Sequence, residues 1–153
     1  MLPALISCTR FATLSPVSSA VIPILRYSDA EKAIAWLCVA FGFELFLKVP
    51  GQAGRIEHAR LILENGMIML ASLGRDSSFD CRFRSPTDVG GITQCTSMIV
   101  HDPNRIFDTA KAAGARIIDD IQDFQFGGRT FSCEDLESHV WVFSSHDPWR
   151  KLW

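Results

Sequence analysis

Hydrophobic positions along the chain follow two spacings, an alternation typical of strands and a longer spacing typical of helices. One helical stretch runs from Ala30 to Phe41, and its apolar side chains recur at i, i+3, i+4 and i+7: Ile34, Leu37, Cys38 and Phe41. Asp29 precedes this stretch and Gly42 follows it. An Asp carboxylate accepts hydrogen bonds from the first backbone N–H groups of a helix, and Gly readily adopts the left-handed conformation that ends one. The pattern therefore predicts a helix over residues 30–41.

Short apolar runs on either side of this helix predict four strands. Their ranges are Val21–Tyr27, Phe43–Val49, His58–Leu63 and Met67–Ser72. The last two flank Asn65-Gly66, which supplies the positive φ angles of a tight hairpin turn. This part of the chain therefore predicts the order strand, helix, strand, hairpin.

The same order recurs about 72 residues later. The second set of elements consists of a strand at Thr93–Val100, a helix at Pro103–Ala113, a strand at Arg116–Ile121, and hairpin strands at Arg129–Cys133 and Val140–Ser144. Asp102 follows Asp29 by 73 positions, and the turn residue Ser138 follows Gly66 by 72. Two copies of so long a repeat indicate a duplicated half-domain of α+β class rather than a solenoid.

The repeat divides the chain into segments. These are an N-terminal extension at 1–20, a first copy at about 21–73, a linker at 74–91, a second copy at about 92–145 and a C-terminal tail at 150–153. Residues 21–149 are predicted to form one domain. The linker is rich in Arg, Ser, Asp and Gly, a composition that fits either a flexible connection or a lid over a pocket.

Composition and charge narrow the function classes. The chain has 153 residues, of which 48% are hydrophobic and 21% charged, and its net charge of −2 gives no electrostatic reason to expect nucleic acid or an anionic membrane as a partner. No run approaches the roughly 20 apolar residues of a membrane span, and Arg10 interrupts what would be the apolar core of a signal peptide. The five cysteines are scattered without a CxxC pair, which predicts reduced thiols in a cytoplasmic protein.

The closing stretch of the second copy points to a family. The sequence FGGRTFSCEDLESHVWVF begins at Phe126, HDPW follows it, and together with the paired copies it resembles the glyoxalase/bleomycin resistance group of the vicinal oxygen chelate (VOC) superfamily, above all its small PhnB-like members. The resemblance covers about Val21–Trp149. It implies two tandem βαβββ modules that curl a mixed sheet into a cup around a small ligand, usually in a homodimer. Trp36, Trp141 and Phe143 offer aromatic surface that favours the dimer.

Metal-dependent members of this group bind a divalent cation through the first and last strand of each module. Their last strand typically contains Gly-His-x-x-Glu, and Val142 stands in the place of that Glu here. The 72-residue offset carries Val142 to Leu70, while the first-strand places fall at Cys95 and Ile22. Ile22, Leu70 and Val142 offer only hydrocarbon. We therefore expect no metal and no other cofactor, with a divalent metal at a displaced site as the alternative.

Alternation along the predicted strands selects the residues that face the cup. His58 and Arg60 differ in parity from the apolar set Ala59, Leu61 and Leu63, which we assign to the helix-packed face. His58 and Arg60 therefore face either the cup or solvent. By parity, His139 should point away from the cup and is interpreted as a turn residue.

In the second copy, the 72-residue offset places Ser132 and Glu134 on the face that corresponds to this polar face. The strands after the turns present apolar side chains, namely Ile68, Leu70, Val140 and Val142, which we expect to wall the cup together with Cys95. Arg129 either contacts a carboxylate or phosphonate group of the ligand or is a loop residue that pairs with Glu134 or solvent.

Two functional classes follow. The first is a metal-free protein that binds or sequesters a small, partly apolar ligand in the cup. The alternative is a glyoxalase-like lyase or isomerase that uses a displaced metal or the acid–base chemistry of His58 and Glu134. The chain has no Gly-x-Ser-x-Gly, P-loop or His-Glu-x-x-His motif, so no residue is assigned a catalytic role.

Overall fold

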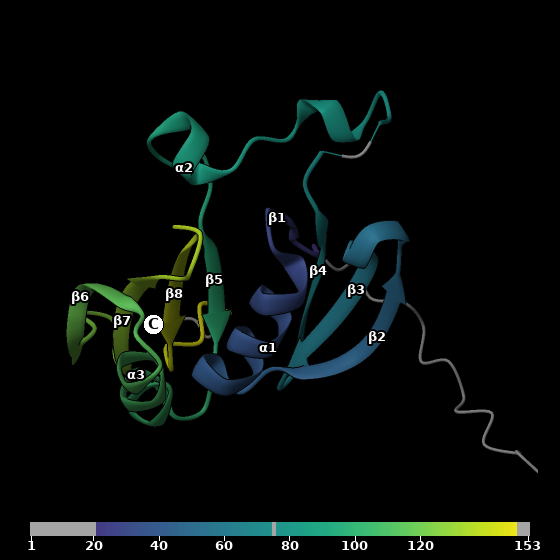
Figure 1. Ribbon diagram of the computed structural model, residues 1–153. Helices are drawn as coiled ribbons and strands as arrows, with labels where there is room; N and C mark the ends of the chain where they lie inside the picture. Colours follow the sequence, from purple (N-terminus) through teal and green to yellow (C-terminus); the bar gives the residue numbers. More distant parts are fainter. Residues whose placement is uncertain (1–20, 75, 150–153) are drawn as a thin grey trace, which may run out of the picture.

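The computed structural model describes residues 21–74 and 76–149, and its first half is a βαβββ module (Figure 1). Its elements are β1 (Ile24–Tyr27), α1 (Ala30–Phe41), β2 (Glu44–Pro50), β3 (Ile56–Leu63) and β4 (Gly66–Ser72). The strands form one sheet in the order β1-β4-β3-β2, in which β1 runs parallel to β4 and the other pairs are antiparallel.

The second module repeats this arrangement. Its elements are β5 (Thr96–Ile99), α3 (Pro103–Ala112), β6 (Arg116–Asp123), β7 (Arg129–Glu134) and β8 (Val140–Ser144), and the sheet order is β5-β8-β7-β6. Again only the first strand is parallel to its neighbour. The predicted α+β class with two tandem βαβββ modules is confirmed. The first strand of each module is shorter than predicted. The predicted extension at 1–20 and tail at 150–153 lie outside the described residues.

The predicted helix caps are present. The Asp29 carboxylate accepts a hydrogen bond from Lys32 N at 3.0 Å, and the Asp102 carboxylate accepts one from Arg105 N at 3.1 Å. Gly42 ends α1 with φ of 81°, a left-handed conformation that an L side chain adopts only at a cost. The first helix therefore has the limits that its sequence predicts.

One hydrophobic core joins both modules, and the two helices pack against each other within it. The Phe41 ring of α1 lies 5.3 Å from Trp141 and 4.8 Å from Phe143, both on β8 of the other module. Trp141 and Phe143 are fully buried, so the prediction that they offer surface to a dimer partner is wrong. Trp36 is partly buried, and its indole N–H donates to the carbonyl of Ala113 at 2.9 Å.

The linker crosses one end of both modules, at the top of Figure 1, and contains the short helices η2 (Asp80–Arg82) and α2 (Pro86–Val89). A third short helix, η1 (Gln52–Gly54), lies in the β2–β3 loop. No helix among residues 21–74 and 76–149 is long and apolar enough to cross a membrane. The cysteines in these ranges, Cys38, Cys81, Cys95 and Cys133, are not joined in disulfides.

Candidate functional site

Each sheet has a helix face, which packs against the core, and an opposite face, which we call the cup face. On β3 the residues Ala59, Leu61 and Leu63 are buried against the core, whereas His58 and Arg60 alternate onto the cup face and are half-buried. The predicted parity of this strand is therefore confirmed. Arg60 Nε donates to His58 Nε2 at 3.1 Å, so this imidazole nitrogen acts as an acceptor.

The cup face of the second module carries Ser132 and Glu134. The Ser132 hydroxyl donates to the Asp119 carboxylate on the neighbouring strand β6. Glu134 accepts two hydrogen bonds from the Arg116 guanidinium, one of them from Nε at 2.8 Å, and its side chain is only 14% exposed. Both predicted residues are thus held by partners within the same sheet.

Arg129 does not lie on a cup face. It has the parity of Phe131 and Cys133, which are buried in the core, and its Nη1 donates to the Asn104 side chain of α3. Its Nε lies 3.4 Å from an Asp123 carboxylate oxygen. The structure therefore places Arg129 on the helix side, apart from the other predicted ligand contacts and from Glu134.

The offset between the two modules is 72 residues in the first strand of the hairpin and 73 residues in the second strand. Arg60 pairs with Met69, whereas Ser132, 72 residues after Arg60, pairs with Val142, 73 residues after Met69. Leu70 pairs instead with Ala59 and is fully buried in the core, so its assignment to the cup wall is wrong. The physical reason is that the β7–β8 turn is longer than the β3–β4 turn.

The same shift moves Ile68 into the core. Met69 therefore corresponds to Val142 at the centre of the cup faces. In the first strands, Ile24 pairs with Met69 and Ser97 pairs with Val142. Cys95 is exposed and precedes β5 with the parity of Ser97, while the predicted place Ile22 precedes β1.

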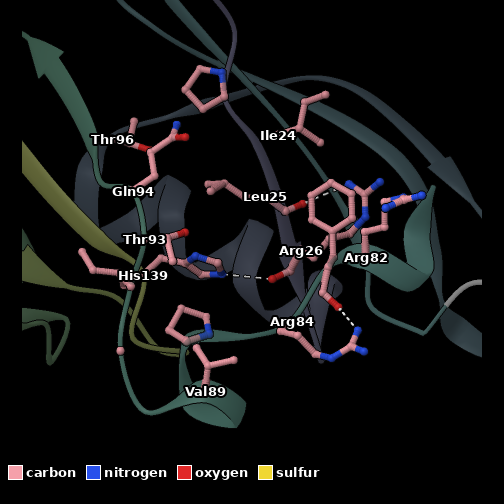
Figure 2. A pocket seen from close by; sticks show the side chains of 15 residues that line it. Ile24, Leu25, Arg26, Arg82, Arg84, Val89, Thr93, Gln94, Thr96 and His139 are labelled. Carbon is pink, nitrogen blue, oxygen red and sulfur yellow. Dashed lines mark hydrogen bonds between the residues drawn. The ribbon is translucent and has the colours of Figure 1, made fainter.

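The linker lines two cavities next to these faces. A cavity of about 270 Å³ lies where the end of α2 meets the second cup face, and its lining includes Arg116, Glu134 and Val140. A second cavity, of about 420 Å³, lies between β1, the linker and the segment that leads into β5 (Figure 2). We call this second cavity the seam pocket because it lies between the two sheets.

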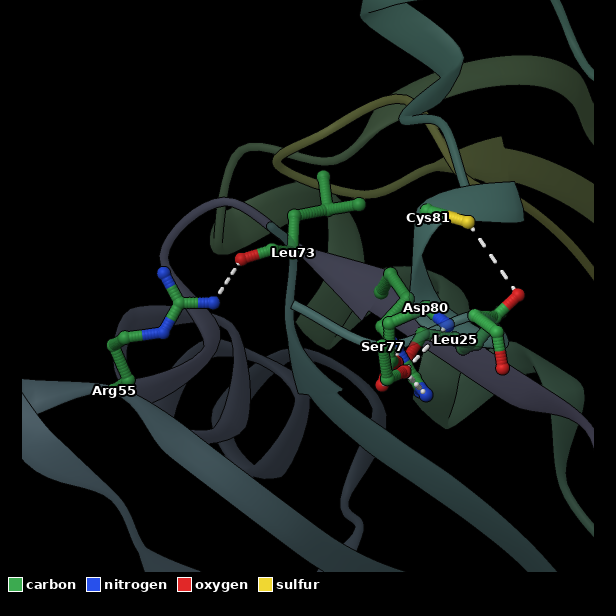
Figure 3. A network of polar contacts seen from close by, with 8 residues as sticks. Leu25, Arg55, Leu73, Ser77, Asp80 and Cys81 are labelled. Carbon is green, nitrogen blue, oxygen red and sulfur yellow. Dashed lines mark hydrogen bonds and ion pairs between the residues drawn. The ribbon is translucent and has the colours of Figure 1, made fainter. Parts of the chain in front are cut away.

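Polar contacts hold the linker over the seam pocket (Figure 3). Arg26 of β1 is buried and donates from Nε and Nη2 to one Asp80 oxygen at 3.0 and 2.7 Å, and its guanidinium stacks 4.4 Å from the Phe83 ring centre. The Ser77 hydroxyl donates to the other Asp80 oxygen at 2.7 Å. Arg55 donates to the carbonyl of Leu73, where the linker begins. Of the two interpretations of the linker, these contacts favour an anchored lid.

The sequence also relates this fold to known proteins. The model of the Glyoxalase/Bleomycin resistance protein/Dioxygenase superfamily matches residues 17–143. The chain belongs to this superfamily. The uncharacterized protein Mb0911c of Mycobacterium bovis is 31% identical over 127 residues, which are 82% of each chain. The uncharacterized protein Rv0887c of Mycobacterium tuberculosis has the same identity, over 82% of this chain and 73% of its own length.

Solved structures of other proteins agree with the glyoxalase-superfamily fold. TioX from Micromonospora sp. ML1 is 32% identical with a TM-score of 0.65, over 85% of this chain and 100% of that one. The fosfomycin resistance protein FosX from Listeria monocytogenes, solved with Mn(II) and 1S,2S-dihydroxypropylphosphonic acid, is 16% identical with a TM-score of 0.59. The match covers 87% of this chain and 94% of FosX, and at this identity it supports the fold alone.

The cup centre does not fit the divalent metal of metal-dependent members of the glyoxalase superfamily. Ile24 and Val142 offer hydrocarbon, Met69 a thioether and Ser97 a hydroxyl, whereas such ions prefer imidazole, carboxylate or thiolate ligands. Across residues 21–74 and 76–149, no three His, Cys, Asp or Glu side chains are grouped so that they could hold a metal ion. We therefore assign no chemical step to a metal.

No motif or periodicity in the sequence indicates the residues of the seam pocket. Arg82 and Arg84 lie in the linker, whose arginine-rich composition was the only available signal. His139, which was expected to be a turn residue, precedes β8 and lines this pocket. Its Nε2 lies 2.9 Å from the carbonyl oxygen of Arg26, and its ring packs 4.7 Å from that of Tyr27.

Proposed function

We propose that this protein binds and retains a small, partly apolar molecule on its cup faces without the help of a divalent metal. The observation that carries the proposal is the chemistry of the cup centre, where the apolar Met69 pairs with Arg60 of β3 and the apolar Val142 pairs with Ser132 of β7. A mostly apolar wall with a few fixed polar groups suits retention of a small organic ligand. A divalent ion at these positions would lose water ligands without gaining protein ligands, which is strongly unfavourable.

The proposed binding sites include the predicted cup residues. His58 and Arg60 supply polar contacts in the first module, and Ser132 and Glu134 supply them in the second. Cys95 is exposed at the edge of the second cup face. Arg129 is left out because it packs against α3.

We also propose that two copies form a homodimer that completes the cups. The cup faces expose large apolar side chains, among them Ile24 and Ile99 at 44% each and Val49 at 41%. Burial of such surface favours association, at roughly 25 cal/mol per Å² before the entropic cost. PhnB-like character and a cytoplasmic location are part of this proposal and rest on the sequence. A monomer mass by light scattering at micromolar concentration would contradict the dimer.

Two measurements test the binding proposal. Titration calorimetry with Ni²⁺, Mn²⁺ or Zn²⁺ should show no one-to-one binding at micromolar concentration. Micromolar binding that His58→Ala abolishes would contradict the proposal, since the ion would then be held on the β3 cup face.

A neutral apolar fluorescent probe, Nile red, tests the cup itself. Val142→Lys should weaken probe binding about tenfold, because a charge then stands in the apolar wall. Val39→Lys is the matched control, since Val39 is an exposed apolar residue on α1, away from the cup faces. Equal loss of probe binding in both variants would place the probe elsewhere and refute the cup as the ligand site.

The alternative of a glyoxalase-like lyase or isomerase has weaker support. Its proposed acid–base pair, His58 and Glu134, belongs to different sheets. His58 Nε2 accepts from Arg60, and Glu134 is paired with Arg116. A proton-transfer pair has to reach the same substrate atoms, and neither residue is presented in that way within one chain.

A further inference from the structure

The described residues that line the seam pocket carry positive charges without negative ones. The protein carries a net charge of −2, yet Arg26, Arg82 and Arg84 all line this one cavity. None of the fifteen described residues that line it is Asp or Glu. The cavity is therefore electropositive in an otherwise slightly acidic protein, and such a cavity concentrates anions.

The three arginines differ in how their charges are compensated. Arg26 is buried and paired with the Asp80 carboxylate, so its role is to fix the linker. Arg82 and Arg84 are exposed in the linker. Arg84 Nη1 donates to the carbonyl oxygens of Cys81 and Phe83, which satisfy the N–H group without neutralising the charge. Among the described lining residues, no carboxylate offsets Arg82 or Arg84.

The opposite wall of the pocket is polar and neutral. Figure 2 shows Thr93, Gln94 and Thr96 across the cavity from Arg82 and Arg84. Between these two sides the lining is apolar and includes Pro23, Ile24, Leu25 and Val89. A volume of about 420 Å³ is within the range of small-molecule sites, about 300–1,000 Å³.

We infer that the seam pocket binds a small organic anion, with its charged group at Arg82 and Arg84 and its apolar body against Ile24 and Val89. Guanidinium groups bind carboxylates and phosphonates through paired, charge-assisted hydrogen bonds, so both anions share the required chemistry. The neutral polar wall at Thr93 and Gln94 accommodates a hydrogen-bonding group at the other end of the ligand. This site goes beyond the proposed function: it shares Ile24 with the first cup face, but its charged end at Arg82 and Arg84 lies in the linker, and it does not require that the cup bind anything.

Titration calorimetry of the full chain tests the inference with three probes that differ only in the head group: 2-naphthoate, 2-naphthylphosphonate and neutral 2-naphthamide. We expect one-to-one binding of an anion at low salt, with the amide bound at least about tenfold more weakly. The Arg82→Gln/Arg84→Gln double variant should weaken anion binding about tenfold. Arg105→Gln, at an exposed arginine on α3 outside the pocket, is the matched control and should change nothing.

A second variant separates binding in the cavity from attraction to surface charge. Val89→Trp fills the pocket and leaves both arginines in place, so it should abolish anion binding. Tighter binding of 2-naphthoate or of 2-naphthylphosphonate would decide between a carboxylate and a phosphonate ligand, and either result supports the site. Equal affinity for the amide, equal loss in Arg105→Gln, or unchanged binding in Val89→Trp would each overturn the inference. The metal and Val142 measurements on the cup are independent of these outcomes.

Discussion

The two hairpin turns that bring the modules together occupy equivalent places in the repeat but use different chemistry. The Glu64 carboxylate, in the β3–β4 turn, accepts from His101 N at 2.9 Å, just before α3. The Glu137 carboxylate, in the β7–β8 turn, accepts from Ser28 N and Asp29 N at 2.7 and 2.9 Å, just before α1. Each module therefore places a carboxylate at the start of the other module's helix, where the positive end of the helix dipole favours it.

The difference lies beneath these exposed contacts. In the second turn, Asp135 is buried and one of its oxygens accepts from Tyr27 Oη at 2.6 Å and from Trp141 Nε1 at 3.0 Å. Its other oxygen accepts from the backbone N–H groups of Glu137 and His139, at 3.0 Å each. In the repeat, Leu63 is equivalent to Asp135 and Val100 is equivalent to Tyr27. Both Leu63 and Val100 are buried and apolar.

The two modules have the same topology, yet their equivalent hairpin turns are stabilised in different ways. The turn between Leu63 and Gly66 is short and exposed, and the buried residues at its base are apolar. The turn between Glu134 and Val140 is longer, and its extra backbone N–H groups close around a buried carboxylate. A buried polar network of this kind is costly unless every member is satisfied, so the second interface should tolerate change much less than the first.

The largest expected effect comes from removing the buried carboxylate. Asp135→Ala leaves the Tyr27 hydroxyl and the Trp141 N–H without their acceptor and should lower the free energy of unfolding by about 3–5 kcal/mol. Urea denaturation of wild type and variant measures the difference. The comparison is Glu64→Ala, on the exposed side. If the two substitutions cost the same, the difference between the turns has no energetic meaning.

The thiol of Cys133, which lies near Asp135, should make the free energy of unfolding depend on pH in the alkaline range. Burial, followed by the charges of Asp135 and Glu134, raises the pKa of Cys133 to about 12, whereas an unfolded thiol has a pKa of about 8.5. Its contribution to stability is complete below pH 8.5 or so, where both states are protonated. As the pH rises, only the unfolded thiol ionises, so stability should fall by about 1.4 kcal/mol per pH unit until the pH nears the folded pKa.

Cys133→Ala should remove most of this dependence between about pH 8.5 and 10, as followed by urea denaturation over that range. A smaller decline should remain, because burial also raises the pKa of the Cys38 thiol. Above about pH 10 a decline should persist, because burial and then the Asp135 charge raise the pKa of Tyr27 well above its ordinary value. Leu61→Ala is the matched control, since Leu61 is the equivalent buried residue in the first module. It should lower stability at every pH and leave the slope unchanged. An unaltered slope in Cys133→Ala would refute the assignment.

A smaller effect is expected from the tyrosine that donates to the buried carboxylate. Tyr27→Phe removes one charge-assisted hydrogen bond and should cost about 1.5–3 kcal/mol. In the Asp135→Ala background the same substitution should cost at least about 1 kcal/mol less, because the acceptor is already absent. A double-mutant cycle by urea denaturation measures this coupling. Equal costs in both backgrounds would mean that the Tyr27 hydroxyl contributes nothing through Asp135.

Local signals in the sequence account for what was predicted correctly. Asp29 and Gly42 fix the ends of α1, and alternation fixes which β3 residues are buried. The one-residue shift between the hairpins was missed because it depends on turn geometry, which a constant offset ignores. That single error placed Leu70 on the cup face instead of Met69.

Contacts between distant parts of the chain could not be predicted in the same way. Tyr27 and Asp135 are 108 positions apart, and Arg26 and Asp80 are 54 apart. Neither pair has a periodic or motif-like signal, because each depends on how the modules and the linker pack. The seam pocket was therefore missed, although its arginines lie in a linker whose composition already allowed a lid.

The smallest effects concern the two exposed carboxylates, which sharpen the comparison because their roles are the same. Glu137→Ala removes the acceptor of two backbone N–H groups at the start of α1 and should cost about 1 kcal/mol, as other helix-cap deletions do. Glu64→Ala should cost about 0.5 kcal/mol, because its partner His101 has a side chain 89% exposed and the pair is screened by solvent.

Amide hydrogen exchange can follow each loss locally, at Ser28 and Asp29 in one variant and at His101 in the other. Faster exchange confined to the altered side would show that the two turns act independently. Faster exchange at both helix starts after either substitution would instead mean that the two interfaces open together, and the contrast in their chemistry would then not make them separate units of stability.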